Sequence, residues 1–93
     1  MITIDDALNY LGIDYGDDDM IYSNVARAIS AADMFMKGAV GTNYPADDPR
    51  AEELMLIVVA DLYDNRGIHD KVSGSVRRLV SDFALQLRLE MRT

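Results

Sequence analysis

The stretch LMLIVVA, residues 54–60, decides the fold because it holds seven apolar residues without a break. Such a run is compatible with a buried strand or with a helix. The flanking residues favour a helix: Asp48 can cap it, Pro49 suits its first position, and the segment continues to Tyr63. A helix that is apolar on all sides must be covered on all sides. We therefore predict that this helix is the centre of a bundle, or that part of it faces another subunit.

A short helix is predicted on the N-terminal side, over about residues 4–11. Thr3 can cap it, and Asp6 stands three residues later, which is the spacing of a capping box. Gly12 is expected to end it. The apolar face of this helix consists of Ala7, Leu8 and Leu11.

The second predicted helix covers about residues 18–37, with a run of three aspartates, residues 17–19, at its start, and Gly38 is expected to end it as a left-handed residue. Its apolar residues recur with helical spacing, at Ile21, Val25, Ala28, Ile29, Ala32, Phe35 and Met36. Its opposite side is expected to be polar, with Ser23, Asn24, Arg27, Ser30 and Asp33. A loop is expected over residues 38–48, because two glycines and Pro45 disfavour regular structure there.

The last predicted helix covers about residues 75–92. Its core stripe is expected to consist of Val76, Leu79, Val80, Phe83 and Leu87. The chain of 93 residues is thus predicted to be a single domain over residues 1–93. Its predicted fold class is all-α, a small four-helix bundle with a central apolar helix and a long C-terminal helix.

Composition and charge restrict the classes of function that the chain can have. The chain has no cysteine, and no apolar run approaches the ~20 residues that cross a bilayer. A soluble, intracellular protein with no membrane partner is therefore expected. The net charge is −7, which argues against simple sequence-independent DNA binding. Residues 1–70 carry 14 acids and four bases, and residues 71–93 carry two acids and five bases. This split indicates either ordinary solvated faces or a head-to-tail contact between copies.

Catalytic and metal sites are not predicted, and no cofactor is expected. The segment LYDNRGIHDK, residues 62–71, holds the only histidine, His69, but no nucleophile motif accompanies it. One histidine without cysteine is too few ligands for a zinc site. The acidic run at residues 14–20 fails the calcium-loop pattern and is interpreted as loop and cap residues. His69 is expected to be a solvated turn residue of little importance.

The last helix carries more apolar and basic side chains than a core stripe needs. Leu85, Leu89 and Met91 fall largely off the stripe, and exposed apolar patches usually mark interaction sites. We therefore predict a contact with another copy or with a partner protein. Its candidate residues are Arg77, Arg78, Leu85, Arg88, Leu89, Met91 and Arg92.

The order of these signals resembles that of the small phage head–tail connector proteins, or head-completion adaptors, which carry a C-terminal Gln-Leu-Arg-Gly-type motif. The similar stretches are ITIDDALNYLGID, DDDMIYSNVARAISAADMFM, DPRAEELMLIVVADLYDNR and VRRLVSDFALQLR. The family's Tyr-x-Asn-Arg sequence corresponds to Tyr63, Asn65 and Arg66, and its Gln-Leu-Arg to Gln86, Leu87 and Arg88. This chain departs from the family at Leu89, where the motif has glycine.

The resemblance implies a structural virion protein of a phage or prophage, not an enzyme. Such subunits form a homo-oligomeric ring under the portal protein at the head–tail junction, after assembly in the bacterial host cytoplasm. The ring extends the DNA channel and serves head completion after DNA packaging, and the next head-completion or tail protein binds to it. DNA only passes through. Two alternatives stay open: a small acidic inhibitor that mimics DNA, and a helical DNA-binding module that uses the arginines of the last helix.

Overall fold

The computed structural model describes residues 2–13, 19–64 and 72–91 of the chain. These residues form four helices and no strand: α1 (Ile4–Leu11), α2 (Asp19–Ala39), α3 (Pro49–Asp64) and α4 (Gly74–Met91). The predicted all-α class and the small four-helix bundle are confirmed. None of the described helices is long and apolar enough to cross a membrane.

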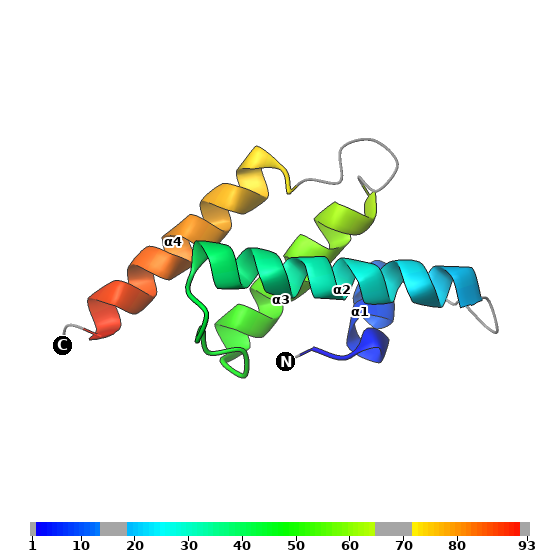
Figure 1. The fold of residues 1–93 in the computed structure, drawn as a ribbon, viewed down its shortest axis with the longest axis horizontal. Helices are drawn as coiled ribbons and strands as arrows, with labels where there is room; N and C mark the ends of the chain where they lie inside the picture. Colours follow the sequence, from blue (N-terminus) through cyan, green and yellow to red (C-terminus); the bar gives the residue numbers. More distant parts are fainter. Residues whose placement is uncertain (1, 14–18, 65–71, 92–93) are drawn as a thin grey trace.

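The bundle is elongated, with extents of 48 × 26 × 20 Å. In Figure 1, α2 crosses over α3, and α1 and α4 lie on opposite sides of α3. Within the described residues, α3 contacts all three other helices, and so does α2, whereas α1 and α4 do not touch each other. The central position predicted for α3 is confirmed, and α2 shares it.

One hydrophobic core joins the four helices, and α3 contributes Ala51, Met55, Val58, Val59 and Leu62 to it. The apolar run of α3 is nevertheless not covered on every side. Its remaining members, Leu54, Leu56, Ile57 and Ala60, are only partly buried. The run therefore serves the core with one face and leaves apolar surface at the edges of that face.

The predicted N-terminal capping residues of α1 and α3 form the expected hydrogen bonds. The Thr3 hydroxyl accepts the N–H of Asp6 at 3.1 Å, and the Asp6 carboxylate accepts the N–H of Thr3 at 2.9 Å, which completes the capping box. Gly12 ends α1 with a φ of 70°, and the following N–H, that of Ile13, bonds the carbonyl of Leu8 at 3.0 Å. Asp48 caps α3 by accepting the N–H of Arg50 at 2.8 Å.

The predicted end of α2 at Gly38 is wrong, because the helix continues to Ala39. The N–H of Val40 donates to the carbonyl of Met36 at 2.8 Å, so the helical bonding passes straight through Gly38. Val40 itself packs against the core, which favours this longer helix. The positive φ that was expected at Gly38 occurs at Gly41, at 147°.

Gly38→Ala is expected to stabilise the protein by about 0.5–1 kcal/mol, because alanine loses less conformational freedom than glycine when it enters a helix. Gly38 lies inside α2 without a positive φ, and an added Cβ would meet nothing within 4 Å. Gly12→Ala is the matched control and is expected to destabilise, because its φ of 70° disfavours a side chain. Thermal melts of both variants check this pair, and a loss of stability in Gly38→Ala would contradict it.

The core stripe of α4 also differs from the prediction at one position. Val76, Val80 and Phe83 are buried and Leu87 packs against the core, but Leu79 is 47% exposed. Ala84 is buried in the core-facing set instead. Leu79 lies at the border between α4 and α3, where the two helices leave a groove.

Candidate interaction surface

The outward side of α4 carries two exposed leucines and two exposed arginines. Leu85 is 54% exposed and Leu89 53% exposed, so their predicted position off the core stripe is confirmed. Arg78 and Arg88 are exposed on the same helix and make no ion pair with any described residue. We call the set Arg78, Leu85, Arg88 and Leu89 the outer ridge. The side chain of Met91 and all of Arg92 lie outside what the structure describes.

Arg77, also predicted as an interface residue, is engaged within its own chain. Its Nε donates to the carbonyl of Val72 at 3.0 Å, and its guanidinium lies 5.5 Å from the centre of the Phe35 ring. These contacts tie the start of α4 to α2, because a guanidinium over an aromatic face is an attractive arrangement. Arg77 therefore holds α4 in place, and we leave it out of the outer ridge.

Of the residues that resemble the two connector motifs, only some lie in the part of the chain that the structure describes. Tyr63 and Leu87 are half-buried against the core, whereas Gln86 is exposed on α4. Asn65 and Arg66 lie outside the described residues, as does His69. The turn that was expected to follow α3 therefore stays a prediction.

A groove runs between the start of α3 and the middle of α4, and it was not foreseen from the sequence. Its volume is about 460 Å³. It is lined by Pro49, Arg50, Glu53, Leu54, Leu79, Asp82, Phe83 and Gln86, and we call it the α3–α4 groove. The available signal was the surplus of apolar residues in LMLIVVA, because a helix that covers one core face needs fewer of them.

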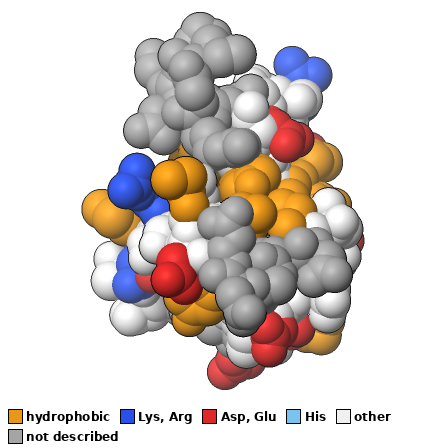
Figure 2. Space-filling view, turned by 90° about the vertical axis from the view of Figure 1, so that its right-hand side faces the viewer, with side chains coloured by type: hydrophobic (Ala, Val, Ile, Leu, Met, Phe, Trp, Pro, Cys, Tyr) orange, Lys and Arg blue, Asp and Glu red, His pale blue; other side chains and the backbone are white. Residues whose placement is uncertain are grey.

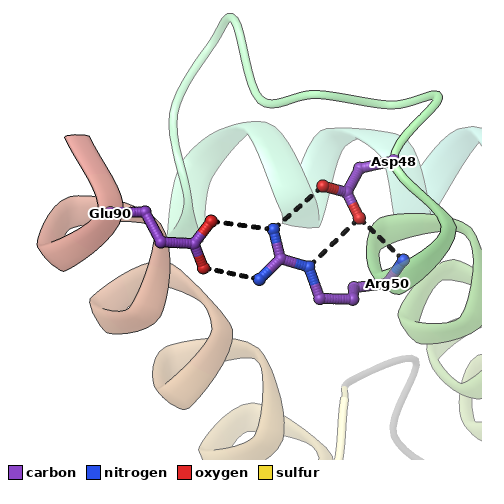
Figure 3. A network of polar contacts seen from close by, with 3 residues as sticks. All are labelled: Asp48, Arg50 and Glu90. Atoms are coloured by element: carbon purple, nitrogen blue, oxygen red, sulfur yellow. Dashed lines mark hydrogen bonds and ion pairs between the residues drawn. The ribbon is translucent and has the colours of Figure 1, made fainter. Parts of the chain in front are cut away.

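One end of the α3–α4 groove is fixed by a cluster of three charged residues (Figure 3). The guanidinium of Arg50 donates to both carboxylate oxygens of Glu90 on α4, at 2.6 and 3.1 Å, and to Asp48 at 3.0 and 3.2 Å. Hydrogen bonds from Arg50 hold the pKa values of the Asp48 and Glu90 carboxyls below their ordinary range. The same guanidinium lies 5.5 Å from the centre of the Phe83 ring. Arg50 thus links the start of α3 to the last turns of α4.

A second polar contact anchors the loop between α2 and α3. The hydroxyl of Tyr44, a buried residue, donates to the Asp33 carboxylate at 2.6 Å, and Lys37 forms an ion pair with Asp33 at 3.0 Å. Asp33 was predicted to lie on the polar side of its helix, but it is half-buried against this loop. The hydrogen bond from Tyr44, and then the one from Lys37, lower the pKa of Asp33. Burial, and then the nearby Asp33, raise the pKa of Tyr44 well above its ordinary value.

Tyr44→Phe is expected to cost about 1.5–3 kcal/mol at pH 7, the range for a hydrogen bond to a charged group. It should also flatten the acid dependence of stability. Because the folded-state pKa of Asp33 is lowered, its contribution is present above the ordinary value of 3.8 and is lost as the pH falls through the lowered value. Urea unfolding at pH 7 and in the acid range measures both effects. The control is Tyr10→Phe, because Tyr10 is exposed. The free energy of unfolding of this variant is expected to lie within about 0.5 kcal/mol of the parent's. Equal losses of stability in the two variants would contradict the prediction.

Hydrophobic side chains also gather at the end of the molecule where α2 begins, as Figure 2 shows. The exposed residues at the start of α2 include Met20 and Tyr22. Among the described residues, no group of three or more histidine, cysteine, aspartate or glutamate side chains could hold a metal ion. The features that stand out on the described surface are apolar and charged faces.

Comparison of the chain with family models, with curated proteins and with solved structures finds no match.

Proposed function

We propose that this chain is a subunit of a phage head–tail connector ring, which docks under the portal protein and extends the DNA channel. The observation that carries the proposal is the outer ridge, where Leu85 and Leu89 are about half exposed on a helix that also exposes Arg78 and Arg88, on a domain whose core is closed without these residues. Contiguous exposed apolar side chains rimmed by charge are typical of protein interaction sites.

Two features of the sequence support the same function. The acidic surplus of residues 1–70 and the basic surplus of residues 71–93 are suited to contact between the tail segment of one copy and the body of the next. The resemblance of four stretches to the connector family supports a connector ring as the assembly in which that contact occurs. The proposed partners are further copies of this chain, the portal protein, and the next head-completion or tail protein, at the head–tail junction of the virion.

The test is the assembly state with and without the portal protein encoded by the same phage or prophage. Light scattering over a concentration series and negative-stain imaging are expected to show rings, either of the chain alone or after the portal protein is added. A chain that stays monomeric at every concentration and does not bind the portal protein would overturn the proposal.

The same preparation tests the DNA-binding alternative, which Arg78 and Arg88 favour because neither is paired with a described acid. A mobility assay at low salt is expected to show no binding by the free chain, because the net charge of −7 repels the phosphates. Binding that weakens steeply as salt rises would support the helical DNA-binding module instead.

A further inference from the structure

The outward face of α4 carries a continuous row of exposed residues that includes one base and one acid. Ser75, Arg78, Asp82, Leu85 and Leu89 follow one another at alternating intervals of three and four residues, and all five are exposed. This spacing is typical of a helix face that packs along a second helix. We call these five residues the α4 seam. Its first part is small and charged, and its last part is apolar.

The other helices of the bundle leave the α4 seam uncovered. In Figure 1, α4 lies at the edge of the molecule, and its core residues, among them Val80 and Phe83, are buried on the side that faces α2 and α3. Leu85 and Leu89 are about half exposed on the opposite side. A second helix can therefore pack along the seam without displacing any described part of the chain.

The two charges of the seam are complementary to each other. Arg78 and Asp82 are one helical turn apart, and neither forms an ion pair with a described residue. A base that precedes an acid at this spacing is the less favourable order for pairing within one helix. When two such helices pack antiparallel about a two-fold axis at the height of residue 80, Arg78 of each copy lies opposite Asp82 of the other. The seam is thus complementary in charge to a second copy of itself.

We propose that two copies of this chain associate through their α4 seams, with the two helices antiparallel. The contact contains two Arg78–Asp82 ion pairs, one on each side of the two-fold axis. Leu85 of each copy then covers Gly74 and Ser75 at the start of the other copy's α4, where small exposed residues let the helices approach closely. The contact is isologous, because both copies contribute the same residues.

The ion pairs also select the register of the contact. An antiparallel pairing that set Leu85 of one copy against Leu89 of the other would place Arg78 beyond the end of the other copy's α4 at Met91. Neither Arg78 would then face a residue of that helix. Complementary charge therefore favours the register centred at position 80.

This contact goes beyond the proposed function. An isologous contact closes on itself with two copies and does not continue around a ring. It therefore describes the chain before assembly, when a second copy covers part of the outer ridge. Stable complexes bury about 1,200–2,000 Å² in total, and one pair of helix faces supplies only part of that. The dimer is accordingly expected to be weak, so its test must trap it covalently.

A single introduced thiol tests the two-fold axis, because the chain has no cysteine of its own. Ser81 is exposed and lies beside the proposed axis, so the two copies of Ser81→Cys come close together in the dimer. A short bismaleimide cross-linker is expected to join them, and peptide mass spectrometry identifies the 81–81 linkage. Met34→Cys, at a position that is 73% exposed on α2, is the matched control for random collisions.

A yield of 81–81 linkage no greater than the yield from Met34→Cys would overturn the proposed contact. The alternative register gives this negative result as well, because it separates the two copies of position 81. Rings or portal binding by a chain that shows no 81–81 linkage would sink this inference and leave the proposed function standing. The linkage in a chain that neither forms rings nor binds the portal protein would support the dimer and count against the connector function.

Charge reversal on the Ser81→Cys protein tests the ion pairs. Arg78→Asp alone and Asp82→Arg alone each replace two ion pairs by two like-charged pairs, so each is expected to lower the yield of 81–81 linkage roughly fivefold or more. A mixture of the two variants is expected to restore the yield, because an acidic seam then meets a basic one. Circular dichroism confirms that each variant is folded. A mixture that cross-links no better than either variant alone would overturn the proposed pairing of Arg78 with Asp82.

Discussion

Val58→Lys is expected to leave the chain unfolded at neutral pH, whereas Leu56→Lys, two positions earlier, is expected to fold. Val58 is fully buried in α3, so a lysine there must place its ammonium group in the core without a partner or lose its proton. Either outcome consumes much of the ~5–15 kcal/mol by which a domain of this kind is stable. Far-UV circular dichroism and thermal melts measure the difference.

Leu56 is the matched control because it belongs to the same apolar run but is only partly buried. It lines a surface hollow together with Asp6 and Glu52, so a lysine there can reach water and two carboxylates. We expect Leu56→Lys to stay within about 1 kcal/mol of the parent. A cooperative melt of Val58→Lys within a few degrees of the parent's would refute the placement of α3 in the core.

Phe83→Ala is expected to destabilise the protein by about 3–5 kcal/mol, because it removes a buried aromatic ring and leaves a cavity. Phe83 is the largest side chain that α4 inserts into the core, and it also lies beneath the guanidinium of Arg50. Urea unfolding gives the loss of free energy. Hydrogen exchange is expected to show that α4 loses protection at milder conditions than α2 and α3.

Leu79→Ala is the control on the same helix, four residues before Phe83. Leu79 is 47% exposed at the groove, so its removal is expected to cost less than about 1 kcal/mol. If Leu79→Ala cost as much as Phe83→Ala, Leu79 would belong to the core, as the periodicity of the sequence had predicted. That result would also remove the floor of the α3–α4 groove.

Local signals predicted the helices well because caps and stops depend on neighbours in sequence. Thr3 with Asp6, Gly12, and Asp48 before Pro49 all act through residues within a few positions of each other. The prediction that Gly38 ends α2 failed because the end of a helix at a glycine does not depend on sequence neighbours alone. Whether a glycine ends a helix depends on whether the bonding beyond it continues, and the packing of Val40 against the core favours that continuation.

Of the two surfaces described above, the outer ridge could be predicted from the sequence and the α3–α4 groove could not. The outer ridge follows from helical spacing, because Leu85 and Leu89 cannot share a face with Val76 and Val80. The α3–α4 groove requires the relative placement of two helices, and no periodic pattern gives that. The same holds for contacts between distant residues: the Tyr44–Asp33 bond spans 11 positions and the Arg50–Glu90 pair spans 40.

The Arg50–Glu90 pair has a consequence for the order in which the chain folds. Contacts between residues far apart in sequence form late, because a long loop must close before they are made. We therefore expect α2 and α3, which are neighbours in sequence, to associate early. The end of α4 is expected to dock against α3 last. The groove exists only once α4 has docked. A nascent chain would then have no complete surface to offer to its neighbours until folding is finished, which separates folding from assembly in time.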